Sequence, residues 1–132
     1  MKGHFDTAIE LRFIETFVQK SLQDRYRMLL HGKRREKALY ELLNCSRYIE
    51  ACRQDVTDTI DTVVARLEGS PRGRKDWYVM TVDTETDGLW LPLRQAIQEL
   101  EYSPGGLVIA EDIRVALLIG EDGLWRWLLQ AD

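Results

Sequence analysis

The amino-acid sequence predicts an α+β fold, in which about four N-terminal helices pack with a small, mostly antiparallel C-terminal sheet that carries one further helix. Three observations lead to this prediction. Apolar residues recur at helical spacing over residues 1–68, short β-favouring runs fill residues 77–132, and a stretch rich in Gly, Pro and charge over 69–76 divides the two parts. The chain has 132 residues, 45% hydrophobic and 30% charged, so we expect one domain over 1–132.

A long first helix is predicted over residues 7–31. Thr7 and Glu10 have the spacing of a capping box, in which each side chain accepts a hydrogen bond from a backbone amide at the helix start. Apolar residues then follow at helical steps from Ile9 onward, and Gly32 can adopt the left-handed conformation that ends a helix.

Three further helices are predicted before the loop over 69–76. Leucines recur at helical spacing over 33–43, which indicates a hairpin with the first helix. Cys45 and Cys52 are seven residues apart, a spacing that places both thiols on the buried side of a third helix and fits neither redox nor zinc chemistry. Apolar residues at helical steps predict a fourth helix over 58–68.

The C-terminal part is predicted to follow the order strand, helix and then three strands. Residues 77–82 are dense in β-favouring residues and apolar on both faces, which is typical of an inner strand covered on each side. Pro92 suits the first turn of a helix, and the Ser-Pro-Gly-Gly run that begins at Ser103 ends it. The remaining strands are predicted over 107–110, 113–119 and 124–129.

Two tryptophans on the last predicted strand allow two interpretations. Trp125 and Trp127 flank Arg126, so both indoles face one side of the strand. They belong either to the core or, at an exposed sheet edge, to an association surface for a partner or a second copy of the chain.

The charge of the chain is divided unevenly along its length. Residues 1–54 carry eleven Lys and Arg against seven Asp and Glu, whereas residues 55–132 carry seven against fifteen. The longest uninterrupted apolar stretch, Val115 to Ile119, is far too short to cross a bilayer, and acidic residues interrupt the N-terminal region where a secretory signal would lie. We therefore expect a cytoplasmic protein with no membrane partner.

The acidic C-terminal half suggests the first functional hypothesis, a non-catalytic protein-interaction domain. Its predicted turns would dock a basic protein partner if they share one end of the sheet, because clustered negative charge speeds encounter with a positive surface. Small acidic inhibitors and immunity proteins of toxic nucleases are the analogous class. The candidate partner-binding residues are Asp83, Glu85, Asp87, Glu121 and Asp122.

The basic N-terminal half suggests an alternative, an RNA- or DNA-associated protein that grips phosphates through a helical hairpin. The candidate phosphate-binding residues are Arg25, Arg27, Lys33, Arg34, Arg35 and Lys37. The net charge of −4 and the pI near 5.2 weigh against a dedicated nucleic-acid module. A structural subunit of a larger assembly is the third possibility, and a homo-oligomer fits either hypothesis.

Residue patterns that carry catalysis or bind metals are incomplete. Asp83 to Gly88 has the form of the opening of a calcium loop, but the bidentate acid needed at its twelfth position is Arg94. His4 and His31 have no ligand-spaced Cys or Asp neighbours, and no serine sits in a nucleophile elbow. We therefore expect no enzymatic activity, no cofactor and no metal.

Overall fold

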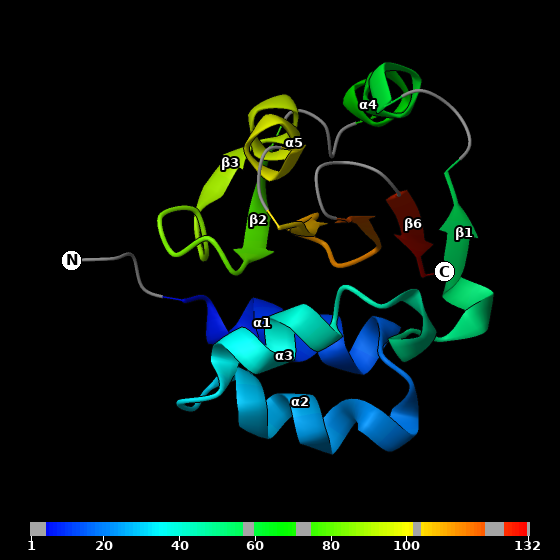
Figure 1. Ribbon diagram of the computed structural model, residues 1–132. Helices are drawn as coiled ribbons and strands as arrows, with labels where there is room; N and C mark the ends of the chain where they lie inside the picture. Colours follow the sequence, from blue (N-terminus) through cyan, green and yellow to red (C-terminus); the bar gives the residue numbers. More distant parts are fainter. Residues whose placement is uncertain (1–4, 57–59, 71–74, 102–103, 121–125, 132) are drawn as a thin grey trace.

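Six strands pair into one antiparallel sheet in the order β1-β6-β5-β4-β2-β3 (Figure 1). The computed structural model describes residues 5–56, 60–70, 75–101, 104–120 and 126–131. The strands are β1 (Arg53–Asp55), β2 (Asp76–Thr81), β3 (Trp90–Pro92), β4 (Gly106–Ile109), β5 (Val115–Ile119) and β6 (Arg126–Gln130). Together with the helices, this sheet confirms the predicted α+β class.

Helices cover both faces of the sheet (Figure 1). They are α1 (Thr7–Phe17), α2 (Gln23–Leu30), α3 (Arg35–Glu41), α4 (Ile60–Glu68) and α5 (Leu93–Glu101). α1 and α3 lie against one face, with α2 packed beyond them, and α4 and α5 lie on the other face. The predicted positions of α3, α4 and α5 are confirmed to within a few residues.

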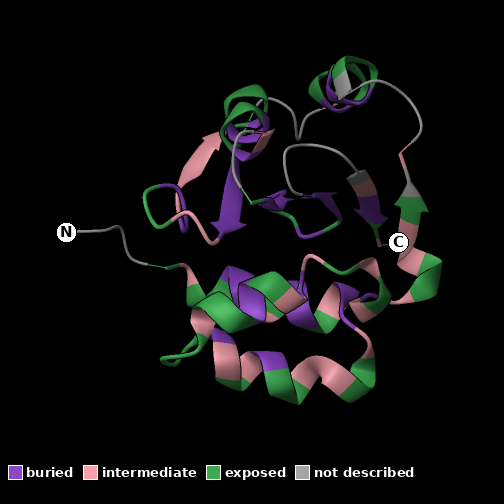
Figure 2. Cartoon of the chain, in the orientation of Figure 1, coloured by how far each residue is buried: buried purple, intermediate pink, exposed green. Residues whose placement is uncertain are grey.

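The inner strand β2 separates two apolar cores. Tyr78 and Met80 face the core shared with α1, α2 and α3, whereas Trp77 and Val79 face the core shared with α4 and α5. All four side chains are fully buried, as the purple segments of Figure 2 illustrate. Because successive side chains of a strand point to opposite faces, the apolar residues on both faces of this run predicted the double burial correctly.

The single helix predicted over residues 7–31 is wrong, because the chain breaks after α1. Val18 is extended and forms an isolated β-bridge with Tyr48, while the amide of Gln19 donates to the carbonyl of Arg47 over 2.9 Å. A short 3-10 turn, η1 (Lys20–Leu22), then leads into α2. The helical spacing of apolar residues continues through the break, so the sequence does not indicate it. The break becomes visible only in the contacts that Val18 and Gln19 make with a distant segment.

The predicted capping box at the start of α1 is also wrong. The side chain of Asp6, one residue earlier than expected, accepts from the amide of Ile9 over 3.2 Å and caps the helix. Thr7 is already the first helical residue. The Glu10 carboxylate is therefore available for the long-range contacts described below.

The helix predicted around the two cysteines is wrong. The chain there forms two 3-10 turns, η2 (Cys45–Arg47) and η3 (Glu50–Cys52), followed by β1. β1 pairs with β6 as an edge strand, which the sequence did not predict. Cys45 and Cys52 are half-buried thiols that pack against the α1–α3 core.

Smaller corrections concern the sheet. β3 was not predicted, and it adds a second short edge strand beside β2. β5 begins at Val115 rather than at Ile113, because Ile113 has a positive φ of 59° within the β4–β5 turn, a conformation incompatible with a strand. At Gly106, an added Cβ would lie 2.6 Å from the carbonyl oxygen of Met80, so glycine permits the close approach of β4 to β2.

Candidate functional site

A buried arginine joins the helical layer to the loop that follows β2. The Arg35 guanidinium donates from Nη1 and Nη2 to the Glu10 carboxylate over 2.8 and 2.7 Å, and from Nε and Nη2 to the Asp87 carboxylate over 2.8 and 3.0 Å. The Glu10 side chain is fully buried, and those of Arg35 and Asp87 are only 12% and 6% exposed. Two bidentate ion pairs thus connect α1, α3 and the β2–β3 loop. We call Glu10, Arg35 and Asp87 together the Arg35 clamp.

Further polar groups complete the hydrogen bonding of Glu10. The Tyr78 hydroxyl donates to Glu10 Oε2 over 2.6 Å and accepts from the amide of Asp6 over 3.0 Å. His31 Nε2 lies 3.4 Å from Glu10 Oε1. Glu10 therefore has partners on both oxygens, which offsets the large cost of burying its charge.

The environment of the clamp keeps Tyr78 protonated and Arg35 charged. Burial raises the pKa of Tyr78 well above 10, and its hydrogen bond to Glu10 raises it further, so the phenol remains a donor. Burial alone would lower the pKa of Arg35, but the hydrogen bonds and charges of Asp87 and Glu10 outweigh that effect and raise it. The Phe5 ring covers the guanidinium, with Arg35 Cζ 3.8 Å from the ring centroid.

The loop between β2 and β3 is a tight turn held at its end by the clamp. The Asp83 carboxylate accepts from the amide of Glu85 over 3.0 Å, and the Asp83 carbonyl accepts from the amides of Thr86 and Asp87. Asp87 also accepts from the amide of Thr81 over 3.2 Å. These bonds hold the turn in one conformation.

Gly88 allows the turn to return to the sheet. Its φ is +86°, a conformation that favours glycine, and its amide donates to the Val79 carbonyl over 2.8 Å. A Cβ at this position would lie 2.7 Å from Cδ1 of Phe5. The turn, the Phe5 ring and the Arg35 clamp therefore fit together only with glycine here.

The predicted acidic residues differ in their accessibility. Glu85 is exposed and Asp83 is half-buried, so both present charge at the surface of the turn. Asp87 is 5% exposed and both its carboxylate oxygens are bonded to Arg35, so it anchors the turn instead of facing solvent. Glu121 and Asp122 lie outside the described residues.

Strand register places the ends of β2 and β5 at the same end of the sheet. Thr81 at the end of β2 pairs with Gly106 of β4, and Gly106 pairs with Ile119 at the end of β5. With about 4.8 Å between neighbouring strands, the ends of β2 and β5 lie about 10 Å apart at the same end of the sheet.

The predicted basic residues divide into two groups. Three arginines have acidic partners: Arg35 in the clamp, Arg25 with Glu41 at 2.7 Å, and Arg27 with Asp24 at 2.6 Å. Lys33, Arg34 and Lys37 are exposed and line a hollow of about 570 Å³ together with Glu36 and Tyr40. We call this the basic hollow.

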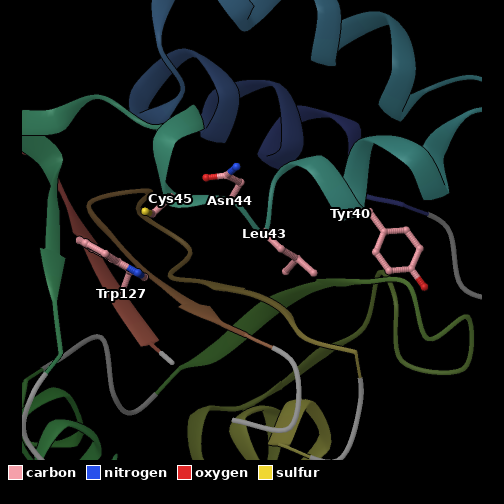
Figure 3. A pocket seen from close by; sticks show the side chains of 5 residues that line it. All are labelled: Tyr40, Leu43, Asn44, Cys45 and Trp127. Atoms are coloured by element: carbon pink, nitrogen blue, oxygen red, sulfur yellow. The ribbon is translucent and has the colours of Figure 1, made fainter. Parts of the chain in front are cut away.

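A second hollow adjoins the first at Tyr40. It has a volume of about 390 Å³ and is lined by Tyr40, Leu43, Asn44, Cys45 and Trp127 (Figure 3). Trp127 is half-buried and packs against the α1–α3 core, whereas Trp125 lies outside the described residues. We call this second site the apolar hollow, because none of the described residues that line it is charged.

The residues that the structure describes contain neither a cluster suited to a metal ion nor a membrane-spanning helix. No group of three or more His, Cys, Asp or Glu in these residues is arranged to hold a metal ion. Likewise, no helix in the described segments has both the length and the apolar character needed to cross a bilayer. His31 lies against Glu10, and His4 is outside the described residues.

The sequence patterns did not predict the Arg35 clamp. One signal could have indicated it: Glu10, Phe13, Ile14 and Phe17 step at i, i+3, i+4 and i+7, so an acid lies on the apolar stripe of α1. A buried acid requires a cationic or hydrogen-bonding partner. The identity of that partner was not predictable, because Arg35 is 25 residues away from Glu10.

Comparisons with known proteins give no match. No protein-family model matches the chain, and neither the curated proteins nor the solved structures yield a significant similarity.

Proposed function

We propose that this protein is a non-catalytic interaction domain that docks a basic protein partner through the turn after β2. The observation that supports the proposal most strongly is the anchoring of this turn by the Arg35 clamp, which leaves Asp83 and Glu85 at the surface. An acidic turn that is ordered before binding loses little conformational entropy when a partner docks. Its charge also speeds encounter with a positive surface.

The proposed contact surface combines two acidic segments. Asp83 and Glu85 supply the first, and Glu121 and Asp122 follow the end of β5, which lies at the same end of the sheet as the end of β2. Asp87 has a different role from the one expected from sequence, because it positions the turn through Arg35. The partner would therefore contact the first four residues and not Asp87.

The proposed class is that of an inhibitor or immunity protein, by analogy alone. A nuclease must keep a basic groove to hold its substrate, so an acidic domain that occupies the groove can block it. A cytoplasmic location is part of the proposal, since Cys45 and Cys52 are thiols and not a disulfide, as is usual in a reducing compartment.

A nuclear magnetic resonance titration tests where a basic surface docks. The isotope-labelled full chain is titrated with a short lysine-rich peptide as the probe. We expect the largest amide shift changes at Asp83, Glu85 and Ile119, because nearby negative charge attracts the peptide there. A variant with Asp83→Asn, Glu85→Gln, Glu121→Gln and Asp122→Asn should lose these shift changes.

A control variant removes the same amount of charge elsewhere. It carries Glu50→Gln, Asp76→Asn, Glu99→Gln and Glu111→Gln, all at exposed positions. This variant should keep the shift changes at the turn. Equal weakening by both variants would mean that the peptide responds only to net charge, which would contradict the proposed surface.

A further inference from the structure

The two hollows along α3 share one lining residue. Tyr40 lines both, and its side chain is 50% exposed, so the apolar hollow and the basic hollow are neighbours on the surface. Figure 3 shows the apolar half running from Tyr40 past Leu43 to Trp127 on β6. We call the two hollows together the α3 groove, and it does not include the acidic turn.

One half of the α3 groove is suited to an apolar side chain. Leu43, Cys45 and Trp127 line it, and all three are half-buried residues that pack against the α1–α3 core. Covering such a surface with an apolar side chain is favourable, because it removes apolar area from water.

The other half of the groove is positively charged. Lys33, Arg34 and Lys37 line it with one acid, Glu36, and none of the three cations forms an ion pair with any described residue. Arg25, Arg27 and Arg35, by contrast, are neutralised by Glu41, Asp24 and the acids of the clamp. The excess of positive charge therefore favours an anionic ligand segment at this end.

We propose that the α3 groove binds an acidic peptide segment of a partner protein, with one large apolar side chain in the apolar hollow and carboxylates beside Lys33, Arg34 and Lys37. This binding surface goes beyond the proposed function, since it lies outside the acidic turn and has the opposite charge. A partner that is itself dipolar could contact both surfaces.

A peptide fits the groove better than a nucleic acid does. A nucleic acid carries a phosphate on every nucleotide, but none of the described residues that line the apolar hollow is a cation that could meet those charges. In Figure 3, Leu43 lies between Tyr40 and Trp127, so the two rings do not form adjacent platforms for stacked bases. The groove instead separates an apolar contact from a charged one.

The test uses a labelled peptide that carries one Phe followed by several Glu, and fluorescence anisotropy with the full chain. We expect saturable binding that weakens about tenfold in the variant with Lys33→Gln, Arg34→Gln and Lys37→Gln, the loss produced by a few weak charge contacts. A control variant with Arg12→Gln, Lys20→Gln and Arg114→Gln removes equal charge from exposed positions outside the groove. It should bind like the wild type.

Alkylation of cysteine locates the bound peptide. Cys45 lines the groove and Cys52 does not, so the peptide should slow iodoacetamide labelling of Cys45 while labelling of Cys52 keeps its rate. Replacing the Phe of the peptide by Gly should abolish this protection. Equal binding of a peptide with Gln in place of Glu, or no protection of Cys45, would overturn the proposal. Tighter binding of an oligothymidylate that protects Cys45 would overturn it in favour of nucleic acid.

Discussion

At the scale of single residues, Arg35 connects the helices to the acidic turn. It neutralises two buried carboxylates, Glu10 and Asp87, and no other Lys or Arg among the described residues pairs with either. Removing one partner of a buried ion pair leaves an uncompensated charge, which is far more costly than losing a surface pair. The clamp is therefore the point at which the helices and the acidic turn depend on each other.

Changing Arg35 to Met should lower the free energy of unfolding by about 3–5 kcal/mol, because Glu10 and Asp87 would remain buried without a counter-charge. Urea unfolding at neutral pH measures the loss. Arg25→Met is the matched control, since Arg25 also forms a bidentate pair with a carboxylate but is exposed to solvent. The control should lose much less stability, and equal losses in the two variants would contradict the role of the clamp.

Sequence patterns at this scale indicated residue types but not partners. Asp87 was predicted to face a protein partner, because it alternates with Asp83 and Glu85 in an acidic turn. Its burial depends on Arg35, which lies 52 residues away in the chain. No local spacing indicates such a pairing. Arg25 and Arg35, predicted to bind phosphate, likewise pair with acids that are distant in the sequence.

At the scale of helices and strands, α2 and α3 are joined by a second carboxylate. Glu41 accepts from Arg25 over 2.7 Å and from the Tyr26 hydroxyl over 2.9 Å. The hydrogen bonds from Arg25 and then Tyr26 lower the pKa of Glu41 to about 2 from its ordinary value of 4.5. Glu41 therefore links the packing of these helices to pH.

The stability that Glu41 contributes should disappear in acid. A carboxyl whose pKa is lowered on folding stabilises the protein above its unfolded pKa, and this contribution is lost as the pH falls from about 4.5 to about 2. The wild type should thus be more stable than Glu41→Gln at pH 7, and the difference should shrink over this range. Urea midpoints across the range measure it, and a difference independent of pH would exclude the ion pair as its cause.

Elements with strong local patterns were predicted correctly, whereas those fixed by distant contacts were not. β2, α4 and α5 have apolar spacings that match only one type of structure. The break after α1 depends on the bridge between Val18 and Tyr48, and β1 exists because it pairs with β6. Three-residue strands of this kind have too little sequence to carry a pattern.

At the scale of the whole molecule, the charge split along the sequence is only partly preserved in space. Arg35 from the basic half and Asp87 from the acidic half neutralise each other inside the protein. Of the candidate binding residues that the structure describes, Lys33, Arg34 and Lys37 in the basic half and Asp83 and Glu85 in the acidic turn remain accessible. We therefore propose binding through two small surfaces and not through two oppositely charged halves.

Capture from a native lysate, with and without nuclease, tests the proposed function most directly. The tagged wild type is compared with the variant that neutralises Asp83, Glu85, Glu121 and Asp122, and bound species are identified by mass spectrometry. We expect the wild type to retain a stoichiometric basic protein after nuclease treatment and the variant to lose it, because the acidic turn drives docking. A partner retained equally by both, or material that disappears with nuclease, would contradict docking through the acidic turn.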